Sequence, residues 1–254
     1  MNHDLSGLLR DWEYQPGQVV ARRFTGEDGT DKIQLRVDLG VLQMNVAGRP
    51  DGKRPMGQET WFDVIRQRLE EHREEHDGDD AEFVLTPEDL TRLQQECIQF
   101  HHRYICFFQL GDYAAVARDC ERNMEVFQFV AHYAATAEAA WSLLQFLPQL
   151  ILMRTRARGS SQLKRRRFEK AIETIEASLN ELEEFYREHE REDLLEGSGE
   201  IHSLRQWLEE VRHRKPLSEV EKLRRALAEA IRTEDYEAAA RVRDELRKLE
   251  SPGS

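Results

Sequence analysis

Cysteine is scarce in this sequence. Among 254 residues there are three, Cys97, Cys106 and Cys120, and no two of them form a CxxC pair. An odd number of widely spaced cysteines is not the pattern of a disulfide scaffold, which small secreted proteins use. We therefore expect free thiols and a reducing, cytoplasmic environment.

Long apolar runs are also missing. The most apolar stretch, residues 127–153, is interrupted by His132, Glu138 and Pro148, so we do not expect it to span a membrane. The first residues, MNHDLSGLLRDWEY, lack the basic and then apolar order of a signal peptide. Both absences favour a chain that stays in the cytoplasm.

The motifs that mark common enzyme sites are absent as well. The sequence has no GxxxxGK[ST] phosphate loop, no GxGxxG after a predicted strand, no GxSxG and no HExxH. We expect no enzymatic activity and no cofactor. A weaker alternative is an enzyme of unrecognised type, with its site between the N-terminal strands and the helices.

Charged residues, by contrast, make up 34% of the chain, whereas glycine (14 residues) and proline (7 residues) are few. This composition favours a mostly helical fold. Acidic residues outnumber basic residues by 49 to 37, which gives a net charge of −12. That charge argues against broad affinity for nucleic acid, although a local basic patch is compatible with it.

The N-terminal segment predicts a small antiparallel β-sheet that follows a short charged helix or arm over residues 1–16. Two predicted strands, 19–25 and 32–38, flank the turn sequence EDGT. Apolar and polar residues alternate over 32–38, and they alternate again in a third run that ends near residue 46. The next turn, GRPDG at 48–52, has two interpretations: a loop for a ligand or partner, or a plain connection. A sheet this small is expected to pack on the helices that follow.

Helical periodicity begins near residue 60. We expect helices over residues 60–75, 86–110, 113–133 and 136–158, the last one kinked at Pro148. The sequence Gly-Ser-Ser at 159–161 should separate it from a long helix that ends near residue 190, and one more helix should reach about residue 211. Thr86 has the features of an N-cap, with Pro87 at the first helical position.

The run Leu110-Gly111-Asp112-Tyr113, followed by Ala117, resembles the turn and second helix of a tetratricopeptide repeat. Weaker echoes, an aromatic residue and then alanine, occur at 167–171 and 235–240. The resemblance implies stacked helical hairpins over residues 86–190 with a groove for a peptide or a helix. We therefore expect a mostly α fold with a tetratricopeptide-like body.

Cysteine and histidine are natural zinc ligands, and one predicted helix carries two such pairs. Cys97 and His101 are four residues apart, as are His102 and Cys106, so each pair shares a helix face. The two pairs point about 100° apart around the helix, which does not suit one tetrahedral site. Because aromatic residues crowd the same helix, we expect buried core residues and no metal.

A basic run lies between residues 154 and 170, and its densest part is Lys164, Arg165, Arg166 and Arg167. Three interpretations are open: contact with nucleic-acid phosphates, contact with an acidic protein surface, or a solvated helix start. Phe168 is the single aromatic residue in the run, which gives little support for stacking on bases.

Residues 217–250 carry the strongest pattern in the chain. Apolar residues recur at helical spacing on both sides of a polar stretch, 232–235, which predicts two amphipathic helices in an antiparallel hairpin. Ala238, Ala239 and Ala240 are small enough to let another helix approach closely. Because so small a hairpin buries little surface alone, we expect its remaining apolar face to bind a partner, with Ala240 at the contact and Ala238 exposed.

The segment Glu234-Asp235-Tyr236-Glu237-x-Ala239-Ala240-x-x-Arg243-Asp244 resembles the UVR motif of the B and C subunits of the bacterial excision nuclease. Similar copies occur in activators of a bacterial protein arginine kinase, which also carry paired CxxC zinc motifs that this chain lacks, and in some Clp-type ATPases. The resemblance implies a helical hairpin that docks on a partner's hairpin or on itself. The residues that it assigns to partner binding are Leu223, Leu227, Tyr236, Glu237, Ala239, Ala240, Arg243 and Asp244.

These features predict three segments: an N-terminal arm and sheet (residues 1–58), a helical body (59–212) and a UVR-like hairpin (216–251). The predicted function is a non-enzymatic cytoplasmic adaptor or scaffold that binds a partner protein, or a second copy, through the hairpin. The alternative is an accessory factor of nucleotide excision repair that contacts nucleic acid through residues 164–167. No metal, cofactor or membrane partner is expected.

Overall fold

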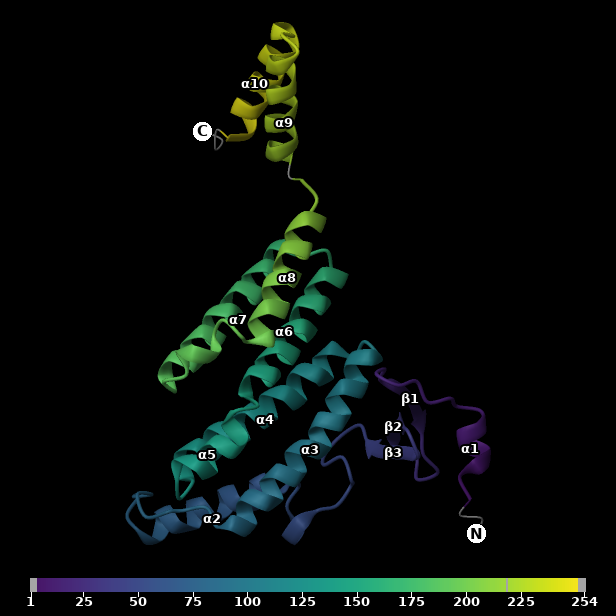
Figure 1. Ribbon diagram of the computed structural model, residues 1–254, viewed down its shortest axis with the longest axis vertical. Helices are drawn as coiled ribbons and strands as arrows, with labels where there is room; N and C mark the ends of the chain where they lie inside the picture. Colours follow the sequence, from purple (N-terminus) through teal and green to yellow (C-terminus); the bar gives the residue numbers. More distant parts are fainter. Residues whose placement is uncertain (1–3, 218, 251–254) are drawn as a thin grey trace. The chain divides into compact units, whose positions relative to one another are not determined.

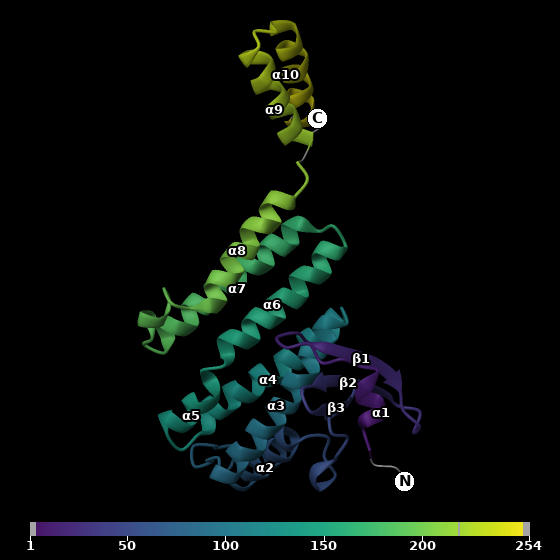
Figure 2. The same cartoon turned by 45° about the vertical axis from the view of Figure 1, so that its right-hand side comes forward.

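The computed structural model describes residues 4–217 and 219–250, which form two compact units that divide after residue 208 (Figures 1 and 2). The first unit holds an N-terminal three-stranded sheet and most of the helices, and the second holds a C-terminal helix pair. The expected fold class, mostly α with a small N-terminal β element and a C-terminal hairpin, is confirmed. The predicted three-segment division stays a prediction.

The sheet is antiparallel, with β2 (Asp31–Val37) between β1 (Val20–Thr25) and β3 (Gly40–Asn45). The alternation of apolar and polar residues predicted one buried face, and the side chains of Ile33 and Met44 are buried in the sheet that packs on α3. Val37 pairs with Gly40 across β2 and β3, so the two residues between them form a tight hairpin turn. A short helix, α1 (Ser6–Arg10), precedes the sheet.

The first long helices begin at threonine caps. After the 3₁₀ turn η1 (Pro55–Gly57), α2 runs over Trp61–Glu75 and α3 over Pro87–Gln109. The hydroxyl of Thr60 accepts a hydrogen bond from the amide of Asp63 at 3.1 Å. At Thr86 the predicted N-cap is confirmed, and it forms a reciprocal capping box with Asp89. These caps satisfy amide groups that the first helical turn leaves unpaired.

The chain breaks earlier around Pro148 than predicted. After α4 (Tyr113–Tyr133), two helices, α5 (Ala137–Leu144) and α6 (Leu147–Lys164), replace the single kinked helix. Pro148 lies in the first turn of α6, where its missing N–H has no intrahelical acceptor to lose. The prediction of a kink at Pro148 is therefore wrong: this proline lies at the start of a helix and does not bend a continuous one.

The predicted Gly-Ser-Ser separator is also wrong, because residues 159–161 lie inside α6. A Cβ atom on Gly159 would stand 2.5 Å from the ring of Trp207, so glycine lets the two helices approach closely. The chain instead turns at residues 165–167, before α7 (Phe168–Glu188). The turn η2 (Glu192–Leu194) then leads to α8 (Gly199–Arg214).

Within the first unit, consecutive helices pack on one another: α3 on α4, α4 on α5 and α6, and α6 on α7. The sheet lies against α3. No helix in the described part of the chain is both long and apolar enough to cross a lipid bilayer.

The second unit contains α9 (Glu219–Arg232) and α10 (Tyr236–Glu250), which pack as an antiparallel hairpin. The connection is tight, because the amide of Asp235 donates to the carbonyl of Ala230 at 2.8 Å. Glu234 takes the left-handed conformation that ends the first helix, with φ of 58°. The predicted hairpin and its turn are therefore present.

Candidate functional site

The C-terminal hairpin has a filled inner face. Ala230 of α9 and Ala239 and Leu246 of α10 are buried, and Leu223 and Leu227 are half-buried beside them. Small alanines at the contact allow the two helices to approach closely, as the sequence predicted. The buried alanine of α10 is, however, Ala239 and not Ala240.

A second strip of the hairpin faces outward. Tyr236, Ala240 and Arg243 follow one another at i, i+4 and i+7, so they line one side of α10. The Tyr236 side chain is 70% exposed at the start of the helix, and Ile231, near the end of α9, is 56% exposed. Two large apolar side chains thus stay in water at the turn end of the hairpin, without a covering element within the described part of this unit.

The charges of the hairpin are mostly exposed. Arg232 donates to Glu229 at 2.6 Å, and this hydrogen bond lowers the pKa of Glu229 and raises that of Arg232. Arg243 donates to Asp244 at 2.9 Å. Both residues were predicted to bind a partner, and in this structure they bind each other. Exposed pairs of this kind contribute little to stability and can exchange for a partner's charges.

The predicted partner-binding residues therefore separate into two groups. Leu223, Leu227 and Ala239 close the hairpin itself, whereas Tyr236, Glu237, Arg243 and Asp244 are exposed, and Ala240 is half-buried beside Tyr236. Ala238 was expected to be exposed, but it is half-buried. The prediction for Ala238 is wrong: Ala238 and Val242, one helical turn apart on α10, are both half-buried.

The basic run does not form one surface. Arg154 pairs with Glu181, Arg156 donates to the carbonyl and hydroxyl groups of Ser203, and Arg158 pairs with Glu121. Lys170 of the run is exposed on α7, and four more exposed cations lie together at the turn between α6 and α7: Lys164, Arg165, Arg166 and Arg167. We call these four residues the basic turn. The Nζ of Lys164 lies 4.5 Å from the centre of the Tyr113 ring.

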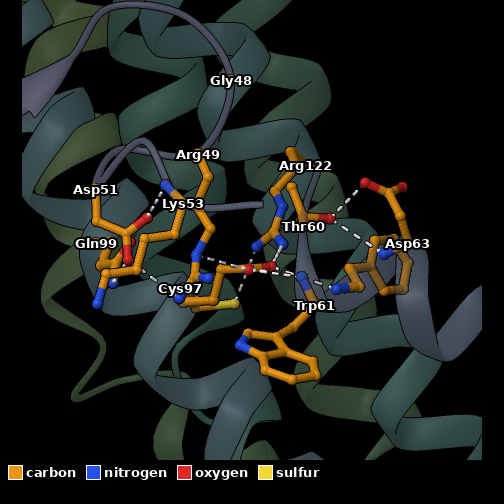
Figure 3. Close-up of polar contacts among 12 residues, drawn as sticks. Gly48, Arg49, Asp51, Lys53, Thr60, Trp61, Asp63, Cys97, Gln99 and Arg122 are labelled. Atoms are coloured by element: carbon orange, nitrogen blue, oxygen red, sulfur yellow. Dashed lines mark hydrogen bonds and ion pairs between the residues drawn. The ribbon is translucent and has the colours of Figure 1, made fainter. Parts of the chain in front are cut away.

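The GRPDG turn is hydrogen-bonded to α3, although Gly48, Asp51 and Gly52 are exposed. Arg103 donates to the backbone carbonyls of Asn45 and Gly48, at 3.0 and 2.7 Å. Asp51 accepts hydrogen bonds from the amide of Lys53 and from the side chain of Gln99 (Figure 3). These contacts favour the interpretation of the turn as a connection that holds the sheet to α3.

Glu96 of α3 is the centre of this region. Its carboxylate is 0% exposed and accepts the amide hydrogens of Trp61 and Phe62, at 2.8 and 3.4 Å, at the start of α2. Arg122 of α4 pairs with it, and Arg49 of the GRPDG turn approaches it at 3.2 Å (Figure 3). One buried carboxylate thus joins the turn, α2, α3 and α4.

A second buried ion pair lies nearby. Arg103 and Asp119, each 1% exposed, form two hydrogen bonds at 2.7 and 2.9 Å. Sequence reasoning missed both Glu96 and Arg103. The available signal was their position: each falls on the apolar stripe of α3, where an isolated charged residue indicates a buried ion pair.

The three cysteines are free thiols and buried. Among the residues that the structure describes, no cluster of three or more His, Cys, Asp or Glu side chains is arranged to hold a metal ion. The ring of His101 shares a hydrogen bond of 2.7 Å with the hydroxyl of Tyr104. Burial raises the pKa of the Cys97 and Cys106 thiols to about 12.

Comparison with protein families gives one result for the hairpin: residues 218–251 match the family model described as the UvrB/uvrC motif. No comparison supports the tetratricopeptide resemblance of the helical body. Neither curated proteins nor solved structures gave a match to the chain. The matched residues span both helices of the second unit, so the C-terminal hairpin of this chain is a UVR motif.

Proposed function

We propose that this protein is a non-enzymatic adaptor that binds a partner protein through the outward strip of its C-terminal hairpin. The observation that carries the proposal is the exposure of Tyr236 and Ile231 at the turn of the UVR motif. Exposed large apolar side chains beside a small residue such as Ala240 suit close packing against another helix. The charged residues Glu237, Arg243 and Asp244 surround this spot and supply orientation.

The test uses two double variants of the full chain in affinity capture from the native host. Ile231→Ala/Tyr236→Ala removes the exposed apolar groups, whereas the control Arg225→Ala/Arg241→Ala changes exposed cations elsewhere on the same hairpin. We expect the first variant to lose the captured partner and the second to retain it. Equal capture by both variants would refute the assignment of this strip. Sedimentation of the purified chain reports whether the partner is a second copy.

The second candidate function, an accessory role on nucleic acid, has one specific observation in its favour. In the basic turn, Arg165, Arg166 and Arg167 are exposed and have no ion pair with any residue that the structure describes. Replacing these three by Gln should reduce the log–log slope of DNA affinity against salt by about 2–3. If the unchanged chain fails to bind duplex DNA at low salt, this candidate is removed.

A further inference from the structure

The helical body contains a groove that is separate from the proposed partner-binding strip of the hairpin. Its volume is about 410 Å³, within the range of ligand sites, and α4 and α7 form its two walls. Both of these helices pack against α6, whose first turns form the floor together with the end of α5. All of its lining residues belong to the first unit.

The floor is apolar. Leu144, Leu147 and Ile151 line it from α5 and α6, and Phe185 lines it from α7. An apolar floor favours apolar side chains from an occupant, because their burial removes hydrocarbon surface from water. The α4 wall is uncharged where Gln128 and Ala131 line it, and both residues are exposed.

The α7 wall is acidic. Glu181, Glu184 and Glu188 line the groove at i, i+3 and i+7, so they stand on one side of the helix. Glu181 is paired with Arg154, but Glu184 and Glu188 have no ion-pair partner in the described part of the chain. No lysine or arginine is among the residues found to line the groove. The unpaired charges of the groove are therefore negative, and they lie along the α7 wall.

We propose that this groove binds an amphipathic helix of a partner protein, with leucine-like side chains on the apolar floor and lysine or arginine along the α7 wall. A helix fits better than an extended strand, because the walls are themselves helices and offer no free backbone groups for a strand to pair with. Long basic side chains can lay their aliphatic stems on the floor and bring their charges to Glu184 and Glu188. Nucleic acid is disfavoured, because its phosphates would be repelled.

The probe for the test is a fluorescein-labelled peptide of about 14 residues, roughly 21 Å as a helix, made only of leucine and lysine at helical spacing. A peptide with glutamate in place of lysine is its control. Fluorescence anisotropy with the full chain measures both affinities at low and at physiological salt. We expect the lysine peptide to bind, the glutamate peptide not to bind, and the affinity to fall with salt.

Two double variants separate the groove from the general negative charge of the protein. Glu184→Gln/Glu188→Gln should weaken the lysine peptide by about tenfold, since two attractive charges are lost. Glu74→Gln/Glu173→Gln removes the same charge from exposed positions outside the groove and should change the affinity by less than about twofold. Gln keeps helix propensity close to that of Glu, so both variants should fold.

A steric variant completes the test. Ala131→Trp places a large ring at the exposed edge of the groove and should abolish binding of the lysine peptide. The proposal is overturned if the two double variants weaken binding equally, if Ala131→Trp leaves the affinity unchanged, or if the lysine peptide fails to bind at low salt. It is also overturned if Ala131→Trp converts a dimer of the unchanged chain into a monomer, because the occupant would then be a second copy. The hairpin variant Ile231→Ala/Tyr236→Ala should leave peptide affinity unchanged, which separates this site from the proposed adaptor surface.

Discussion

At the scale of single residues, the buried charges of α3 hold the N-terminal sheet to the helices. Arg103 bonds to Asp119 and to the carbonyls of Asn45, at the end of β3, and of Gly48, and Arg103 and Asp119 are both buried. Removing one partner of a buried pair leaves an uncompensated charge, which costs more than the pair itself contributes. The same reasoning applies to Glu96.

Arg103→Met keeps much of the side-chain volume but removes the buried partner of the Asp119 carboxylate, which keeps its ion pair with the more exposed Arg118 at 2.9 Å. We expect a loss of about 3–5 kcal/mol in the free energy of unfolding, measured by urea denaturation. Arg165→Met, at an exposed cation of the basic turn, is the control and should change stability by less than about 0.5 kcal/mol. A small effect of Arg103→Met would mean that Arg118 or water compensates the charge of Asp119.

The thiols give a second prediction at this scale. Cys97 and Cys106 have pKa values raised to about 12 by burial, and burial raises the pKa of Cys120 as well. At pH 8 a pKa three units above the ordinary value leaves about a thousandfold less thiolate, the form that reacts. We expect iodoacetamide to label all three thiols slowly in the native protein and rapidly in urea. Fast labelling of the native protein would show that this core opens.

At the scale of elements, the close approach of α6 and α8 depends on one glycine. Gly159→Ala introduces a Cβ atom 2.5 Å from the Trp207 ring, and overpacking of this kind costs about 1–3 kcal/mol. Gly159→Ala should destabilise the Trp207→Leu variant less than it destabilises the unchanged protein, because leucine removes the ring that the Cβ atom would meet. Thermal unfolding of the four proteins measures this coupling. Additive effects would contradict the close contact.

The hairpin offers a matched pair of substitutions that separates its folding from its docking. Ala239→Glu places a carboxylate on the buried inner face, whereas Ala228→Glu adds the same side chain at an exposed position of α9. Glu has good helix propensity, so burial alone should distinguish them. We expect hydrogen exchange over residues 219–250 to speed up in Ala239→Glu and to stay nearly unchanged in Ala228→Glu. Similar exchange in both would show that Ala239 does not hold the two helices together.

The elements were largely predictable from the sequence, because their signals are local. Thr86 with Pro87, and the alternation around Ile33, depend on neighbours within a few residues. Gly159 was misread because its role depends on Trp207, 48 residues later in the chain, and no local pattern records that contact. The hairpin was recognisable because its pattern lies within one short segment. The acidic groove was not, because residues of α4 and α7, far apart in the sequence, line it together.

At the scale of the whole molecule, the chain divides into two units whose boundary in the sequence, after residue 208, falls within α8. Removing residues 216–254 takes away α9 and α10 and leaves α1 through α8 complete. We expect the truncated chain to unfold cooperatively on heating, because every buried ion pair of the first unit is retained. A molten or insoluble product would show that the hairpin belongs to the main core.

The contacts of Glu96 also lead us to expect an order in which parts of the chain become stable during synthesis. The GRPDG turn and the start of α2 depend on Glu96, Arg103 and Arg122, which the ribosome adds after the sheet is complete. We expect this small sheet to be less stable before α3 forms, because α3 packs on it and Ile33 and Met44 are buried in the finished structure. We therefore expect the sheet and the GRPDG turn to become stable only after α3 and α4 have been synthesised. Until then, chaperones and proteases should bind this segment more readily than they do in the folded protein.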